Sequence, residues 1–390
     1  MPFTFLKKSF LSPLLEFIHD SRAMGIAIVS ATVLSLVITN TGWGTDYLSF
    51  WNTSFDTGHY LPHSLLHWIN DGLMALFFFL AGMEIKRELM IGELSSLKKS
   101  IMPVMGALGG MVVPALLFSI LNSGTVYSNG WGVPMATDIA FSLGIASLLG
   151  KRVPVALKIF LTALAIIDDL GAIVAIAAFY TNEIHLIYLF IGTGIMILLS
   201  VWNYLKLPFG IWNFAAGIAL WFCFFNSGVH ATVAGVLFAF TIPMNRLSDI
   251  EHAIHNYVNF LIVPLFVLAN TAILIPAGII HQLNTTLSLG IMLGLVIGKP
   301  IGILLFCWLT VQLKFGELTK GLNWKHMTGL GLLAGIGFTM SIFIALLAFS
   351  DPTIQDISKM AVMLATLLAI ILSFVWFKFF TKGTAPETLA

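Results

Sequence analysis

Apolar stretches of membrane-spanning length follow one another along most of this sequence. A helix needs about 20 predominantly apolar residues to cross a bilayer, and in lipid only helices or closed barrels pair all their backbone polar groups. Of the 390 residues, 58% are hydrophobic and 9% are charged, a balance that no soluble core requires. We therefore predict an all-α polytopic membrane protein, a single domain with about twelve transmembrane helices. Their expected extents are 23–40, 64–86, 101–121, 130–149, 155–180, 184–204, 209–225, 228–243, 257–279, 288–311, 327–349 and 358–380.

The distribution of Lys and Arg predicts the orientation of these helices, because cytoplasmic connections collect positive charge. With the amino terminus inside, all of the 19 Lys and Arg residues except Lys299 and Lys359 fall at cytoplasmic ends or loops. We therefore expect cytoplasmic termini, with residues 1–22 as an amphipathic lead-in and 383–390 as a tail. The long connection 41–63 would lie outside the membrane on the opposite side, as a loop or a small hairpin.

Charge and cysteine content narrow the range of partners. The formal net charge of +1 gives no reason to expect nucleic acid. Cys223 and Cys307 both lie in apolar stretches, and we interpret them as small hydrophobic residues rather than as a disulfide or a metal site. We expect no cofactor and no enzymatic activity.

Four ionisable residues lie in the middle of predicted membrane helices: Asp138, Asp168, Asp169 and Lys299. A charge inside a bilayer costs several kcal/mol, so such residues usually serve ions or protons. Adjacent helical residues point about 100° apart, and Asp168 and Asp169 therefore cannot present their carboxylates to one ion in the same way. These four residues are the first candidates for function.

Two predicted helices contain breaks. The segment GWGVPMATDIAF, residues 130–141, has Pro134 and several small or polar residues just before Asp138, and proline removes a hydrogen bond from a helix interior. The segment GLLAGIGFTMSIF, residues 331–343, has three glycines, which close helix packing would also explain. Corresponding interruptions in two halves of a chain indicate discontinuous helices within inverted repeats. Helices three to five and ten to twelve would be the repeats, with breaks in helices four and eleven.

Six segments carry a family resemblance: WINDGLMALFFFLAGMEIKREL, VPMATDIAFSLG, LKIFLTALAIIDDLGAI, SGVHATVAG, IGKPIGI and GIGFTMSIFIA. In sequence and order these segments closely resemble the NhaA-type sodium/proton antiporters of bacteria. The resemblance runs from about residue 23 to the last predicted helix. It implies a multi-pass protein of the bacterial inner membrane that moves Na⁺ or Li⁺ outward in exchange for H⁺, with a net movement of charge.

The resemblance also implies roles for individual residues. Asp168 and Asp169 match the family's paired aspartates, with Asp169 as the main ligand of cation and proton. Asp168 would pair with Lys299 when no cation is bound. Asp138 and Lys299 would offset the partial charges of the broken helix ends, and Thr137 belongs to the same motif. The structural alternatives are a static Asp168–Lys299 pair, a helix cap at Asp138, and a packing or backbone-bonding role for Thr137 and Thr339.

A second group of residues matches the family's charged cytoplasmic region and its pH regulation: Glu84, Glu88 and Glu251, with His230 as a further group that titrates near neutrality. The alternatives are ordinary interfacial charges and a histidine at a helix end. Asp71 is expected near the outer end of helix two, about 20 Å from Glu84 at 1.5 Å per residue, so these two acids cannot share a site.

Other functions are compatible with some of these features. A lysine inside a membrane helix could carry retinal, but retinal pumps have about seven helices. A passive cation channel and a K⁺/H⁺ exchanger of the same fold are the remaining alternatives. Membrane lipid and a second copy of the chain, bound through residues 41–63, are the other expected partners.

Overall fold

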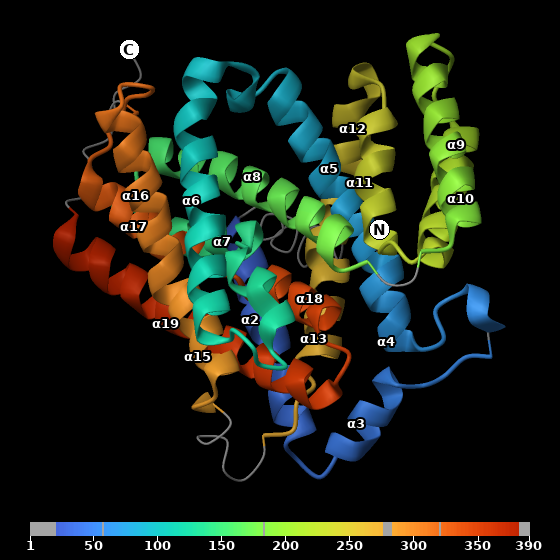
Figure 1. The fold of residues 1–390 in the computed structure, drawn as a ribbon, viewed down its shortest axis with the longest axis horizontal. Helices are drawn as coiled ribbons and strands as arrows, with labels where there is room; N and C mark the ends of the chain where they lie inside the picture. The colour runs from blue at the N-terminus through green and yellow to red at the C-terminus, as the bar shows by residue number, and fades with distance from the viewer. Residues whose placement is uncertain (1–20, 57, 182–183, 276–282, 320, 382–390) are drawn as a thin grey trace, which may run out of the picture.

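The computed structural model describes residues 21–56, 58–181, 184–275, 283–319 and 321–381. Within these ranges the chain is almost entirely helical, and the β-structure is limited to one isolated bridge. Figure 1 shows a bundle in which α9 (Leu186–Tyr204) and α10 (Ile211–Ser227) stand at one edge, with α8 (Val155–Phe179) running through its middle. The predicted tail and residues 1–20 of the predicted lead-in lie outside the described residues.

The described residues contain nine helical spans that are long and apolar enough to cross a membrane. The pair α17 (Trp324–Ala334) and α18 (Phe338–Ala348) adds a tenth, bent by 48° at its break. The shorter apolar helices α10 and α11 (Ala231–Thr241) occupy the positions of predicted helices seven and eight. These segments together account for the twelve predicted helices. The nine spans are Arg22–Thr39, Leu65–Met90, Lys99–Leu121, Ser128–Leu148, Val155–Phe179, Leu186–Tyr204, Met244–Asn270, Thr286–Gln312 and Pro352–Phe380.

Three of the spans contain a π-helical segment. A π turn inserts an extra residue, which rotates the following side chains about the helix axis and is frequent at functional sites. The composite spans are α4 (Leu65–His67), η2 (Trp68–Leu73) and α5 (Met74–Met90); α12 (Met244–Tyr257), η6 (Val258–Ile262) and α13 (Val263–Asn270); and α15 (Thr286–Leu293), η7 (Gly294–Gly298) and α16 (Lys299–Gln312). The remaining elements are α2 (Ser21–Thr39), α3 (Gly44–Trp51), α6 (Leu97–Leu121), η4 (Ser128–Met135), α7 (Ile139–Leu148) and α19 (Pro352–Phe380), with short 3₁₀ turns between them.

The ninth span differs from its predicted extent. It begins at Met244, 13 residues before the predicted start, and its last helix ends at Asn270 rather than at residue 279. Its first turns are amphipathic, since Leu247 is buried while Arg246 is exposed. A search for continuous apolar sequence misses such a helix, because only one of its faces packs against the protein.

The connection 41–63, for which the sequence allows a loop or a hairpin, is largely helical in its first half. Helix α3 occupies residues 44–51, and a single antiparallel bridge joins Ser54 to Ser64. The backbone N–H of Phe55 donates to the carbonyl of His63 at 2.8 Å. The bridge holds the end of this connection against the beginning of α4, although it does not extend into a two-stranded hairpin.

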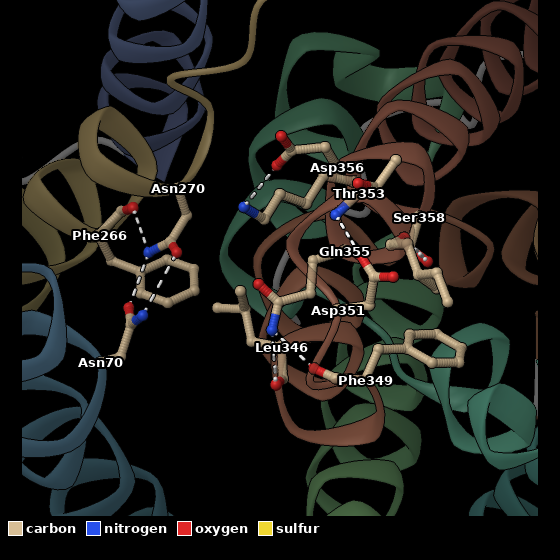
Figure 2. A network of polar contacts seen from close by, with 12 residues as sticks. Asn70, Phe266, Asn270, Leu346, Phe349, Asp351, Thr353, Gln355, Asp356 and Ser358 are labelled. Atoms are coloured by element: carbon tan, nitrogen blue, oxygen red, sulfur yellow. Dashed lines mark hydrogen bonds and ion pairs between the residues drawn. The ribbon is translucent and has the colours of Figure 1, made fainter. Parts of the chain in front are cut away.

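A reciprocal pair of side-chain amides joins the second and ninth spans. Asn270 donates to Asn70 Oδ1 at 2.8 Å and to the carbonyl of Phe266 at 2.9 Å, and Asn70 donates back to Asn270 Oδ1 at 3.4 Å (Figure 2). Asn70 belongs to the π-helical segment η2, and Asn270 ends α13. Because Asn270 is 1% exposed, its amide needs these partners inside the protein.

The turn between α18 and α19 is closed by side chains. Gln355 donates to the carbonyl of Phe349 at 2.6 Å, just beyond the end of α18, and Asp351 accepts from the N–H of Thr353 at 2.7 Å at the start of α19 (Figure 2). Free carbonyls at a helix end and free N–H groups at a helix start need such partners. These contacts fix the carboxyl-terminal end of the broken eleventh span.

Glycines bring the helices around the centre of the bundle into close contact. In α6 and α16, a Cβ atom built on Gly302 would collide with the carbonyl oxygen of Gly109, and one on Gly109 would collide with that of Gly302. Likewise a Cβ on Gly235 of α11 would collide with the carbonyl of Ala75 in α5. Small residues permit this approach of helix backbones. The close α6–α16 packing positions Lys299 at the start of α16.

Candidate functional site

The two broken spans meet at their breaks. Between η4 and α7 the backbone is extended over residues 136–138, and between α17 and α18 the helix is interrupted at residues 335–337. The N–H of Asp138 donates to the carbonyl of Ile336 at 2.8 Å, so backbone from one break pairs with backbone from the other. The hydroxyl of Ser142 donates to the carbonyl of Leu333 at 2.9 Å. Backbone groups left free by the breaks therefore find partners inside the protein, as a membrane requires.

Asp138 caps the amino-terminal ends of two helices with one carboxylate. Its Oδ1 accepts from the N–H of Phe141 at 2.9 Å in α7. Its Oδ2 accepts from the N–H of Thr339 at 3.0 Å and from the Thr339 hydroxyl at 2.5 Å in α18. A negative charge at a helix amino terminus is favoured by the aligned peptide dipoles. The structure thus gives Asp138 a capping geometry and places it at the crossing, the point where the breaks of the fourth and eleventh spans meet.

Asp168 and Lys299 form an ion pair beside this crossing. Lys299 Nζ lies 2.8 Å from Asp168 Oδ2, and neither side chain is exposed. The hydroxyl of Thr137 donates to the same oxygen at 2.7 Å and lies 3.1 Å from the carbonyl of Ala334. Asp168 comes from α8, Lys299 from α16 and Thr137 from the break before α7. The pair therefore joins the fifth and tenth spans to both broken helices.

Lys299 has a second partner at the end of a half-helix. Its ammonium donates to the carbonyl of Met135, the last residue of η4. A positive charge at the carboxyl end of a helix is stabilised by the partial negative charge of the free carbonyls. The π-helical segment η7 ends at Gly298, so a π turn directly precedes Lys299 in the tenth span. The crossing consequently has a carboxylate at the amino ends of α7 and α18, and an ammonium at the carboxyl end of η4.

Asp169, the other paired aspartate, is 3% exposed and has a different environment. Among the described residues its Oδ1 has no hydrogen-bond partner and its carboxylate forms no ion pair. Asp168 Oδ1 and Ser341 Oγ, within the same described part of the chain, also have no partner. Buried polar atoms without partners are rare and call for an explanation. Unpaired carboxylate oxygens are suitable ligands for a small hard cation or for a proton.

Asp71, the acid expected near the outer end of the second span, is close to His67. Its Oδ2 lies 2.8 Å from His67 Nε2. His230 Nε2 lies 3.0 Å from the carbonyl of Tyr180 at the end of α8. The Tyr180 hydroxyl in turn accepts from the N–H of Gly132 at 3.1 Å in η4. His230 thus lies where α8 ends, linked through Tyr180 to η4 of the fourth span.

The three glutamates of the predicted regulatory group lie together at the other end of the second span. Arg87 forms ion pairs with the buried Glu251 and with Glu88, the latter at 3.6 Å. His255 Nδ1 lies 4.0 Å from Glu84 Oε1. The structure therefore brings Glu84, Glu88 and Glu251 into one cluster between α5 and α12, and it separates His230 from them.

Some members of these networks were not singled out by the sequence. Thr339, for which the sequence favours a packing or backbone-bonding role, donates twice to Asp138. Its position directly after the glycine-rich break was a usable signal, because the first residues of a half-helix have free N–H groups. Arg87 and Tyr180 give no comparable signal, because the contacts of Arg87 with Glu251 and of Tyr180 with Gly132 join residues that are far apart in the sequence.

A bundle of membrane spans with two crossed, discontinuous helices and buried charges at their breaks defines a secondary transporter. Residues 15–377 match the family described as Na⁺/H⁺ antiporter 1, and the chain belongs to that family. Among its relatives, Na⁺/H⁺ antiporter NhaA 2 of Flavobacterium johnsoniae is 46% identical over 382 residues, which cover 95% of this chain and 94% of the relative. The NhaA antiporters of Cytophaga hutchinsonii (44% over 381 residues, 96% and 97% covered) and Citrobacter koseri (43% over 376 residues, 93% and 97% covered) are similar too.

Proposed function

We propose that this protein exchanges Na⁺ or Li⁺, moved outward, for H⁺, moved inward. Membership of the Na⁺/H⁺ antiporter 1 family supports the reaction, and so does the similarity to relatives named Na⁺/H⁺ antiporters. The observation that carries the proposal is the pair of adjacent buried aspartates, one bound to a lysine and the other unpaired, beside two crossed helix breaks. The exchange would serve pH and sodium homeostasis.

In this proposal Asp169 is the main ligand of the transported cation and of the exchanged proton. Its unpaired oxygen is free to accept either one, and hard cations such as Na⁺ favour carboxylate oxygen. Asp168 holds Lys299 while no cation is bound and joins the ligand set when the cation arrives. Thr137, whose hydroxyl already donates to Asp168, orients that carboxylate.

Competition for one site is sufficient to couple the two fluxes. A carboxylate pair that binds a cation releases its protons, and a protonated pair has no room for the cation, so each ion leaves as the other enters. Asp138 and Lys299 keep their charges at the ends of the broken helices and stabilise the crossing. If two protons return for each Na⁺, every cycle moves one net charge.

We further propose that the protein lies in the inner membrane of a bacterium with both termini in the cytoplasm. The Lys and Arg distribution supports this orientation, since the clustered charges of α5 and α12 then face the cytoplasm. Residues 41–63 lie on the outer side in this orientation, where they could join two copies of the chain. Surrounding lipid is the other partner.

The cytoplasmic cluster of Glu84, Glu88 and Glu251 is proposed as the regulatory region. Its support is geometric: Glu251 is 5% exposed, one of its oxygens lacks a hydrogen-bond partner among the described residues, and Arg87 binds the other. A change in the charge of Glu84 or Glu251 would alter the strength of the ion pair by which Arg87 joins α5 to α12. His230 is proposed as a separate pH-responsive group at the opposite end of the bundle.

The test uses purified protein in proteoliposomes that contain a pH-sensitive dye. Adding Na⁺ or Li⁺ to one side should drive protons to that side, and K⁺ should produce a much smaller response. Sodium flux driven by voltage without counter-movement of protons would instead identify a cation channel and contradict the proposal. A response to K⁺ as large as that to Na⁺ would identify a K⁺/H⁺ exchanger.

A further inference from the structure

Two histidines face each other where the connection 41–63 meets the second span. His63 Nδ1 lies 3.0 Å from His67 Nδ1, with the ring centroids 4.7 Å apart and the planes at 71°. His63 is exposed, and the His67 side chain is 29% exposed. Neither takes part in the proposed exchange site. Two ring nitrogens directed at one another at a solvent-accessible position are a recognisable arrangement for binding a metal ion.

The backbone holds both rings in place. The N–H of Phe55 donates to the carbonyl of His63 at 2.8 Å, and Ser64, bridged to Ser54, caps α4 by accepting from the N–H of His67 at 3.1 Å. The His67 ring also packs against Phe225 of α10, with a centroid separation of 5.4 Å. A ligand pair that is already oriented loses little conformational entropy on binding an ion.

Asp71 sets the form of His67 that a metal needs. Its Oδ2 lies 2.8 Å from His67 Nε2 and accepts the proton of that nitrogen. A neutral ring with its proton on Nε2 presents a lone pair on Nδ1, toward His63. Metal-bound histidines commonly donate their other N–H to a carboxylate in this manner. The carbonyl of Asp71 accepts from Trp221 Nε1 at 2.9 Å, which anchors Asp71 against α10.

The nitrogen separation fits an ion of the zinc class. With Zn–N bonds of about 2.0–2.1 Å, two nitrogens 3.0 Å apart give an N–Zn–N angle of about 95°. Increasing the separation of the two nitrogens by about 0.3 Å would give the tetrahedral angle. Imidazole is a preferred ligand of Zn²⁺, Ni²⁺ and Cu²⁺, whereas Mg²⁺ and Ca²⁺ prefer oxygen. Among the described residues no group of three or more His, Cys, Asp or Glu side chains is arranged around a metal position. The pair therefore supplies two ligands and leaves the other positions to water.

We propose that His63 and His67 bind one imidazole-preferring divalent transition-metal ion, with Asp71 as the carboxylate that orients His67. The ion replaces the hydrogen bond between the two Nδ1 atoms and joins the connection 41–63 to the second span. This site is separate from the Asp168 and Asp169 region and does not depend on the proposed exchange activity.

The experiment is isothermal titration of Zn²⁺ into the purified full-length protein, produced without a polyhistidine tag, in a weakly coordinating buffer. One Zn²⁺ should bind per chain, and Mg²⁺ should give no such isotherm. His63→Gln and His67→Gln should each abolish this binding step. Asp71→Asn, which keeps both ligands, should weaken it about 10- to 100-fold.

The control is His252→Gln, since His252 is exposed on α12, lies 3.4 Å from Ser248 and is far along the chain from the pair. This variant should bind Zn²⁺ like the wild type. Thermal unfolding without metal shows whether each variant is folded. Because His63 is exposed, the His63→Gln variant should remain folded and can test the site even if His67→Gln is unstable. Zn²⁺ binding that is unchanged in His63→Gln, or wild-type binding no tighter than that of Mg²⁺, would overturn the proposal.

Discussion

Lys299 Nζ lies 2.8 Å from Asp168 Oδ2, and both side chains are fully buried. The same ammonium donates to the carbonyl of Met135 at the end of η4. One positive charge therefore neutralises a carboxylate of the fifth span and the carboxyl end of a half-helix in the fourth. Removing either charged partner leaves the other alone in a medium that solvates it poorly, which makes the pair testable by stability as well as by transport.

Lys299→Gln should lower the free energy of unfolding by about 3–5 kcal/mol, because it leaves Asp168 as an uncompensated buried charge. Lys299→Arg, which keeps the charge, should lower it less and retain more transport. The double variant Lys299→Gln with Asp168→Asn should recover much of the lost stability, since neither charge is then left alone. Thermal unfolding in detergent measures all three. Unfolding of Lys299→Gln at the wild-type temperature would contradict the ion pair.

Asp168→Asn and Asp169→Asn should both abolish exchange in proteoliposomes, yet they should differ in stability. Asp168→Asn leaves Lys299 without its carboxylate and should be destabilised. Asp169→Asn removes a buried charge whose Oδ1 has no hydrogen-bond partner among the described residues, so it should be at least as stable as the wild type. Wild-type exchange by folded Asp169→Asn protein would remove Asp169 from the ion site.

The sequence predicts the parts of this site better than their connections. Buried charges stand out because few residues in the spans are charged, and Pro134 indicates a break in helix four on steric grounds. The partners of these residues are harder to predict. The bond from Lys299 to the Met135 carbonyl depends on how the tenth span is rotated, and the sequence gives no clear signal for the π segment that precedes Lys299.

The sequence also predicts some helix boundaries well and misses others. Uniformly apolar helices such as α9 are found within a residue or two, because every face of the helix meets lipid or protein. The start of the ninth span at Met244 is missed, because α12 is polar on one face and its burial depends on α5. Glu251 is buried on this helix, and hydropathy alone would exclude such a residue from the interior.

Asp138→Ala should destabilise the protein by about 2 kcal/mol, because a lost helix cap costs about 1 kcal/mol and this carboxylate caps two helices. Asp138→Asn should cost less, since an amide oxygen still accepts from backbone N–H groups. Thr339→Val tests the second helix alone: it removes the hydroxyl donor and leaves the backbone bond of residue 339 in place. Denaturant unfolding compares the three variants, and equal stability of Asp138→Ala and the wild type would exclude the double cap.

Gly302→Ala should destabilise the protein by about 1–3 kcal/mol and reduce transport, because its Cβ collides with the Gly109 carbonyl between α6 and α16. The matched control is Gly194→Ala in α9, where a Cβ meets nothing within 4 Å. Alanine favours a helix over glycine by about 1 kcal/mol, so this control should be neutral or slightly stabilising. Melting temperatures of the two variants that do not differ would refute the close packing.

The last prediction concerns pH and follows from competition at the aspartates. A proton and a cation that bind the same carboxylates exclude each other, so the apparent KM for Na⁺ should rise as the pH falls. One competing proton gives about a tenfold rise per pH unit and two give about a hundredfold, because each unit multiplies the proton activity by ten. At alkaline pH the KM should level off once the site holds no proton.

A change at the Glu84 cluster or at His230 should instead alter mainly the maximal rate. Transport currents on a solid-supported membrane, recorded at several pH values, measure KM, maximal rate and net charge together. An Na⁺ KM that is constant from about pH 6 to pH 9 would rule out a shared site, even if Asp169 proved essential.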